Sequence, residues 1–144
     1  MKYGIKIVEL DIYRYSLENN DLDWGRKKPT GNININVTVS ATMPAKELSV
    51  KIDIHIFIRH PKKNASLPAG SIETISGYQI DNWDAFVKRT GEKYKVEEKL
   101  KMELVRISYD NTRGLLRERG RNDIIGKIVL PVIDPHELLK SSSK

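Results

Sequence analysis

The fold is decided by two consecutive stretches of the chain, NININVTVSAT at residues 32–42 and ELSVKIDIHIFIR at residues 47–59. Apolar and polar residues alternate in both, which is the period of a strand with one buried face and one wetted face. Because only residues 43–46 separate them, we expect the two strands to pair as a long β-hairpin. The buried face is predicted to carry Ile33, Ile35, Val37, Val39, Ala41, Leu48, Val50, Ile52, Ile54, Ile56 and Ile58.

Two further strands are expected, one before this hairpin in the sequence and one after it. Residues 5–18 form the first, and their apolar positions move out of phase midway along it. A phase shift of one residue predicts a bulge, or a strand that is buried on both faces. Residues 71–80 form a weaker strand that is interrupted by Gly77. Loop compositions separate the strands at residues 19–31, which contain Trp24, and at residues 60–66.

The second half of the chain changes to helical spacing. Apolar residues recur three and four positions apart over residues 96–116, which predicts one long amphipathic helix. Gly114 near its end is a candidate C-cap, whereas Leu115 and Leu116 favour a helix that continues further. Its packing layer is expected to contain Leu100, Met102, Val105 and Tyr109. Shorter elements are expected at residues 82–88 (a helix or turn capped by Asp81 or Asn82), 117–122 (a charged loop), 124–133 (an extended apolar segment) and 134–139 (a helix with Asp134 as its cap and Pro135 at its first position).

The order of these elements predicts an α+β fold. It consists of a four-stranded antiparallel sheet with one long helix packed on one face and a short C-terminal helix. One helix is only about 10 Å wide, whereas four strands spaced about 4.8 Å apart span nearly twice that width. We therefore expect apolar sheet surface that the long helix leaves uncovered. A second subunit, the segment at residues 124–133, or a bound apolar ligand or peptide are the candidates that would cover it.

Composition excludes several classes of protein. The 144 residues carry a net charge of +6, with no cysteine, and fit one domain. Without cysteine there is no disulfide, thiolate metal site or cysteine nucleophile. No apolar run approaches the roughly 18 residues of a membrane span. The N-terminal stretch is interrupted by Glu9 and Asp11, so we expect no secretory signal and a cytoplasmic protein.

The residues that carry chemistry are sparse. His55, His60 and His136 are scattered, and no phosphate-binding glycine motif or nucleophile motif occurs, so we predict no catalytic residue, metal site or cofactor. Basic clusters do occur in predicted loops, where they are able to contact phosphates. They lack the interleaved aromatic residues of a base-stacking surface, so a small polyanion-binding or nucleic-acid-binding protein is kept as the alternative function. The clusters are residues 26–28, residues 62–63, and Arg117, Arg119 and Arg121.

At the level of whole segments, the chain resembles the SecB-type protein-export chaperones and their SecB-like relatives. The first predicted strand contains VELDIYRYSLE at residues 8–18, which is similar to the family's first strand with its Ser-Phe-Glu-like step. The sequence ETISGYQI at residues 73–80 is similar to the glycine-containing fourth strand. The sequence NTRGL at residues 111–115 resembles the Arg-Gly end of the family's helix, and LPVIDPHELL at residues 130–139 resembles its C-terminal pattern.

The resemblance implies a non-enzymatic chaperone built as dimers that pair into a tetramer, with apolar grooves that hold unfolded or precursor polypeptide. Residues 1–140 would form a single SecB-like domain and residues 141–144 a disordered tail. We predict that Trp24, Ile33, Ile35 and Val37 line the peptide-binding groove. Export members are typically acidic and dock on the SecA motor, so the charge of +6 argues against SecA docking. Another client, such as an antitoxin-type or envelope-protein precursor, fits at least as well.

Overall fold

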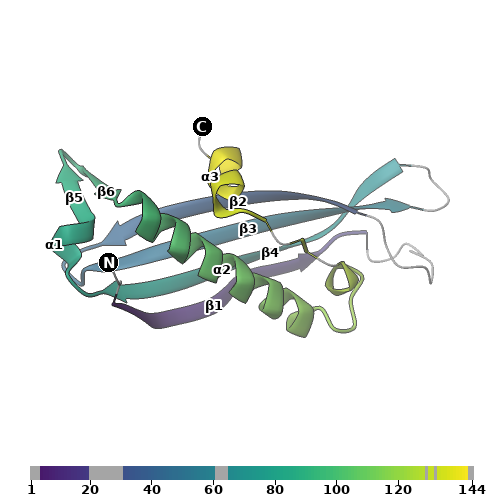
Figure 1. The fold of residues 1–144 in the computed structure, drawn as a ribbon. Coiled ribbons are helices and arrows are strands. Elements are labelled where there is room, and N and C mark those ends of the chain that lie inside the picture. The colour runs from purple at the N-terminus through teal and green to yellow at the C-terminus, as the bar shows by residue number, and fades with distance from the viewer. Residues whose placement is uncertain (1–3, 20–30, 61–64, 129, 132, 143–144) are drawn as a thin grey trace.

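The computed structural model describes residues 4–19, 31–60, 65–128, 130–131 and 133–142. Its centre is an antiparallel sheet of four strands in the order β1-β4-β3-β2, with a long helix laid across one face (Figure 1). The predicted fold class is therefore confirmed. The strands are β1 (Ile5–Leu17), β2 (Gly31–Thr42), β3 (Glu47–His60) and β4 (Ala65–Ile80).

The hairpin of β2 and β3 has the predicted register. Ile33 pairs with Ile56, and the alternation continues to Thr42 and Glu47 without a register shift. The inward side chains of β3 from Leu48 to Ile58 are at most 2% exposed. Strict alternation makes this register strongly preferred, because a slip of one residue would move the whole apolar set to the wetted face.

The outer strands are less regular than the hairpin. Register shifts between Ile7 and Glu9 and between Ile12 and Arg14 break the pairing of β1 with β4, so the predicted bulge is confirmed. Strand β4 begins at Ala65 and not at the predicted Ser71. Sequence alternation is weak there because the strand contains Pro68, which has no backbone N–H to donate to a ladder.

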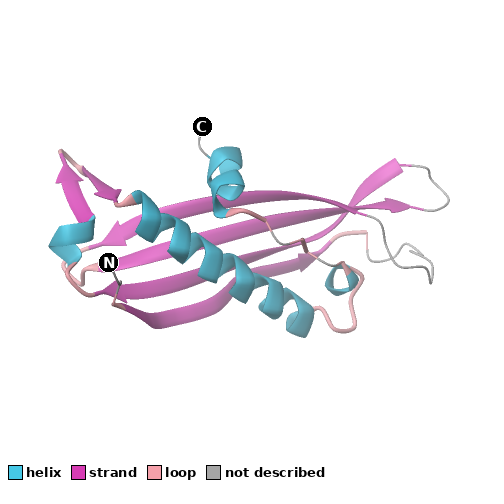
Figure 2. Ribbon diagram, in the orientation of Figure 1, coloured by secondary structure: helices cyan, strands magenta, loops and turns pink. Residues whose placement is uncertain are grey.

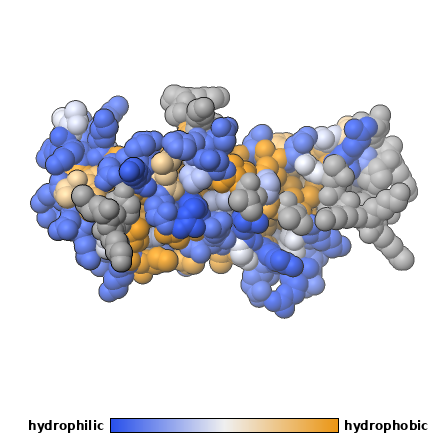
Figure 3. All heavy atoms as spheres, in the orientation of Figure 1, coloured by the Kyte–Doolittle hydropathy of each residue, from blue (hydrophilic) through white to orange (hydrophobic). Residues whose placement is uncertain are grey.

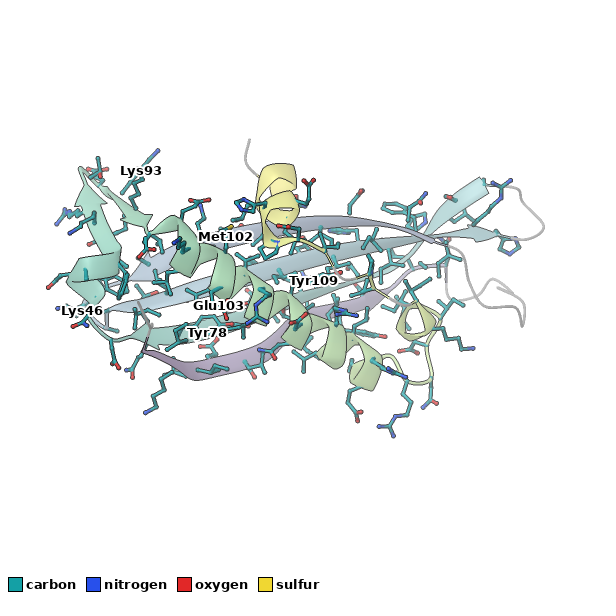
Figure 4. The ribbon with its side chains drawn as sticks, in the orientation of Figure 1. Lys46, Tyr78, Lys93, Met102, Glu103 and Tyr109 are labelled. Carbon is teal, nitrogen blue, oxygen red and sulfur yellow. The ribbon has the colours of Figure 1, made fainter. Side chains whose placement is uncertain are left out.

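The long helix α2 (Glu98–Arg119) crosses the sheet diagonally (Figure 2). Leucines of α2 and Val105 pack on the sheet, and a row of hydroxyl groups lies among them. The hydroxyl of Tyr78, which is labelled in Figure 4, is 2.6 Å from Ser108 Oγ. Thr74 Oγ1 is 2.7 Å from Thr112 Oγ1. Burying hydroxyl groups without partners is costly, so these pairs fix the position of the helix along the sheet.

The helix or turn expected at residues 82–88 is present as a single helical turn, α1 (Trp83–Phe86). Asn82 is at its N-cap position but makes no side-chain capping bond. Helix α1 is followed by a hairpin of β5 (Val87–Thr90) and β6 (Lys93–Val96), which the sequence did not indicate because each strand has only four residues. Of the packing layer expected on α2, Leu100, Val105 and Tyr109 are buried, and Met102 is half-buried.

Helix α2 ends at Arg119, so the continuation past Gly114 that Leu115 and Leu116 favour is confirmed. Gly114 therefore lies inside it, and the expected charged loop at residues 117–122 is partly helical. Gly120 is the C-cap, and a Cβ on Gly126 would collide with the Gly120 carbonyl, so backbone meets backbone at this turn. The expected extended segment contains the single 3-10 turn η1 (Ile125–Lys127).

The C-terminal helix α3 (Pro135–Ser142) follows. Its predicted cap is confirmed, because Asp134 Oδ1 accepts a bond of 2.8 Å from the backbone N–H of His136. The helix includes two of the residues assigned to a disordered tail, and residues 143–144 lie outside the described residues. None of the described helices is both long and apolar enough to cross a bilayer.

Candidate functional site

The structure places three of the four predicted groove residues on β2. Ile33 and Ile35 are half-buried on the face that carries the helices, whereas Val37 is buried in the core with 7% of its surface exposed. Trp24 lies outside the described residues. The predicted set is therefore split between an accessible pair and a supporting core residue.

Ile33 and Ile35 border an open groove of about 500 Å³ between β2 and α3. Because side chains alternate along β2, both isoleucines lie on the same face of the sheet as α3. Leu138 of α3 lines the same groove and is only 2% exposed. We call this cavity the β2 groove. It is lined by Ile33, Asn34, Ile35, Asn36, Ile133, Glu137 and Leu138.

The β2 groove follows a free sheet edge. Strand β2 is last in the strand order and pairs only with β3 among the described strands. A terminal strand presents backbone N–H and C=O groups that an extended chain is able to pair with. The groove therefore combines apolar side chains with a hydrogen-bonding edge, which together suit an extended polypeptide.

The opposite edge carries apolar residues that the sequence prediction missed. Among the described residues, five large hydrophobic side chains are exposed, and four of them are on β1. Ile7 is 50% and Leu10 is 39% exposed, although they pair with Tyr78 and Ser76 on the face that α2 covers. We call Ile7 and Leu10 the β1 strip. The signal for it was the phase shift of β1, from which a bulge or a strand buried on both faces was predicted; β1 is mostly exposed.

Both apolar areas are visible on the helix side of the molecule. Figure 3 shows one of them over β1, below α2, and the other over β2 and β3 beside α3. Helix α2 lies between them. The expectation that one helix leaves apolar sheet surface uncovered therefore holds, and the uncovered surface lies at both edges of the sheet.

The titratable groups of this face do not form a catalytic arrangement in the described part of the chain. Burial raises the pKa of Tyr109 to about 12, and it also raises the pKa of Tyr78. Burial and a hydrogen bond to Asp123 raise the pKa of Tyr15. All three phenols stay protonated near neutral pH, and Tyr15 and Tyr109 donate hydrogen bonds to Asp123 and to the Pro131 carbonyl. No group of three or more metal-ligating side chains occurs within the described ranges.

The opposite face of the sheet is polar and of mixed charge. The Lys51 ammonium lies 2.8 Å from Glu73 Oε1 and 5.4 Å from the centre of the Tyr13 ring. His55 Nε2 lies 3.2 Å from Asp53 Oδ2. The ion pair with Glu73 raises the pKa of Lys51. Cations and carboxylates alternate here, so this face differs from an acidic docking surface.

Of the predicted basic clusters, the one that the structure describes has two of its three arginines in contact with other side chains of the chain. Arg119 stacks 4.5 Å over the Tyr15 ring, and Arg121 Nη2 lies 2.7 Å from Glu118 Oε2. The clusters at residues 26–28 and 62–63 lie outside the described residues. Of the third cluster, Arg117 and Arg119 have no carboxylate within 4.0 Å among the described side chains, and Arg119 is held by the Tyr15 ring.

Comparison with known proteins adds evidence on the fold. No protein-family model and no curated protein matches the chain. Among solved structures, it is similar to a SecB-like chaperone of Mycobacterium tuberculosis in complex with a ChAD peptide from the HigA1 antitoxin. The match covers 90% of this chain and 89% of that chain, with a TM-score of 0.60 and 14% identity.

A protein of unknown function from Streptococcus agalactiae also matches, with a TM-score of 0.33, 13% identity and coverage of 83% of this chain and 90% of that chain. The similarity to the mycobacterial chaperone concerns three-dimensional structure and does not extend to a sequence family. With the sheet order and the helix placement described above, it gives this chain a SecB-like fold.

Proposed function

We propose that this protein is a SecB-like molecular chaperone that binds non-native or extended polypeptide and is not an enzyme. The observation that carries the proposal is the apolar surface left at both edges of the helix-covered sheet face. Removing such surface from water is favourable, and unfolded chains offer apolar side chains on an extended backbone. The fold shared with a chaperone that was solved with an antitoxin peptide supports the same class of partner.

The proposed binding site is the β2 groove. A client segment would run along β2, pair with its free backbone edge and place alternate side chains on Ile33 and Ile35. Val37 supports this surface from the core, and Trp24 stays a prediction. The inward side chains of β3, which pairs with β2, are buried and hold β2 in place. The groove is therefore formed before a client binds, which lowers the entropy cost of binding.

We further propose that the β1 strip is covered by a second copy of the chain, in a homodimer or homotetramer. Exposed apolar residues on an edge strand favour edge-to-edge association. Each protomer would be the single domain predicted for residues 1–140. In this arrangement the β1 edge serves assembly and the β2 edge serves clients.

Client binding is tested with an aggregating unfolded substrate and with a labelled apolar peptide. The protein should delay aggregation, and Ile35→Asp should weaken peptide affinity at least about tenfold, because it buries a charge in place of an isoleucine. Ser40→Asp is the matched control, since it adds the same charge on the exposed face of β2. A wild-type protein that neither binds the peptide nor delays aggregation would refute the proposal.

Assembly is tested by solution mass from light scattering. The wild-type protein should be a dimer or tetramer, and Leu10→Lys should shift it toward monomer because a lysine disfavours edge association. Ser40→Lys, at the other edge of the sheet, should leave the mass unchanged. A wild-type monomer would contradict the role given to the β1 strip.

We do not propose SecA docking, because the mixed charges around Lys51 and Glu73 give the outer face no acidic surface. The alternative function, a small polyanion-binding protein, has less support since Arg119 and Arg121 already have partners within the chain. It predicts an affinity that falls steeply with salt. Binding of an uncharged apolar peptide should change little with salt, so the two functions separate in one titration series.

A further inference from the structure

A second cavity, of about 590 Å³, lies between the C-terminal half of α2 and the segment that follows it. The turn at Gly120 and Gly126 folds this segment back against the helix and so forms the cavity. The cavity has an apolar part and a cationic part, and we call it the cationic cleft. It is lined by Asp110, Arg113, Gly114, Leu116, Arg117, Gly126, Lys127, Ile128 and Leu130.

The cleft has cations that are not neutralised within the chain. Its carboxylate, Asp110, lies 3.5 Å from Arg113 Nη1 and 3.6 Å from Arg106 Nη1, so that acid is already shared. Among the described residues, neither Arg117 nor Lys127 has a carboxylate within 4.0 Å. An anion from outside the chain is therefore the complement that the cleft lacks.

Gly114 is a second feature of this surface that packing within the described chain does not explain. A glycine inside a helix costs stability relative to alanine. At Gly120 and Gly126 the backbone contact explains the glycine, but nothing lies within 4 Å of a Cβ built on Gly114. Packing within the chain therefore does not require Gly114, whereas close approach of another backbone to the helix does.

The cationic cleft and the β2 groove are bordered by the same segment of the chain. Ile128 and Leu130 line the cleft, and Ile133 of the same segment lines the groove. Leu130 and Ile133 are three residues apart, so their Cα atoms are separated by at most about 11 Å. The Tyr109 hydroxyl donates a 2.7 Å bond to the Pro131 carbonyl, which fastens the segment between the two cavities to α2. One extended peptide of fewer than about ten residues is long enough to reach both.

We propose that the cationic cleft selects clients by binding a carboxylate that follows the apolar stretch held in the β2 groove. This inference rests on the proposed chaperone function and adds the client class: extended segments in which Asp or Glu adjoins apolar residues. Arginine forks match a carboxylate with two parallel bonds, Lys127 adds a point charge, and the apolar wall takes the neighbouring side chain. A nucleic acid fits less well because no aromatic side chain lines the cleft.

The test compares two labelled ten-residue peptides in fluorescence anisotropy. Both carry alternating apolar residues, and one ends in an Asp-Glu pair where the other has Asn-Gln. The acidic peptide should bind about tenfold more tightly at low salt, as charge-assisted bonds predict. The preference should vanish in the double variant Arg117→Gln/Lys127→Gln and persist in Arg121→Gln, whose guanidinium pairs with Glu118 outside the cleft.

The outcomes separate this inference from the function on which it rests. Equal binding of the two peptides to the wild-type protein overturns the client class and leaves the chaperone function standing. Failure of both peptides to bind overturns both proposals. A short single-stranded RNA that displaces the acidic peptide, with the same dependence on Arg117 and Lys127, would assign the cleft to a polyanion. A lower solution mass of the double variant would instead assign it to a second copy of the chain.

Discussion

The two edges of the sheet carry similar apolar side chains but differ in the regularity of the strand and in how far those side chains are exposed. At the β2 edge the register is unbroken, α3 packs against the strand, and Ile33 and Ile35 are half-buried beside a groove. At the β1 edge two register shifts interrupt the strand, and Ile7 and Leu10 stay exposed. Regular pairing therefore accompanies a formed groove, whereas the bulged strand leaves an open apolar strip that suits a flat contact with another copy.

The largest effect that tests this comparison is on stability. Ile54→Ala, at a fully buried position of β3, should lower the free energy of unfolding by about 2–5 kcal/mol because it leaves a cavity. Ile7→Ala should cost under about 1 kcal/mol, since half of that side chain is already in water. Urea denaturation at low protein concentration measures both. An equal loss in the two variants would mean that the β1 strip is part of the core and is not spare surface.

The strands and the long helix were predictable because their patterns are strict and long. Alternation over β2 and β3 determined the hairpin, its register and the inward residues. The β5–β6 hairpin was not predictable, since four residues are too few to show a period. The end of α2 was not predictable to the residue because Gly114 is an ordinary stop signal, and only the contact of Gly120 with Gly126 shows where the chain turns.

The candidate site was predictable only in part. Ile33 and Ile35 came from the alternation, but their partners in the groove come from α3, which is distant in sequence. The exposure of Ile7 and Leu10 depends on where α2 crosses the sheet, and that position is set by the hydroxyl pairs of Thr74 and Tyr78 with the helix. The cationic cleft needs the turn at Gly120, so no sequence spacing brings Arg117 and Lys127 together.

An intermediate effect on the free energy of unfolding is expected at alkaline pH. Near each edge of the sheet, a tyrosine hydroxyl donates a hydrogen bond that a deprotonated tyrosine would lose. Tyr109 fastens the segment beside the β2 groove, and Tyr15 on β1 donates a 2.7 Å bond to Asp123. The folded pKa of Tyr109, about 12, exceeds its ordinary value of 10.0. Its contribution to stability is therefore complete below pH 10 and is lost as the pH rises toward 12.

The free energy of unfolding should fall by on the order of 1–2 kcal/mol over that range, and Tyr109→Phe should remove much of the fall. At neutral pH this variant should lose about 1 kcal/mol with the bond to Pro131. Tyr13→Phe is the control, because Tyr13 is 62% exposed. An unchanged slope in Tyr109→Phe would show that the segment beside the groove does not depend on this hydrogen bond.

The smallest effect separates stability from binding at the cationic cleft. Gly114→Ala should raise the free energy of unfolding by about 0.5–1 kcal/mol, because alanine favours the helix and its Cβ meets no neighbouring atom. If Gly114 admits a client backbone, the same methyl group should weaken binding of the acidic peptide while the protein becomes more stable. Thermal denaturation and peptide titration of one variant measure the two quantities. A gain in stability with unchanged affinity would leave the glycine without a role in binding, and the client class would then depend on Arg117 and Lys127 alone.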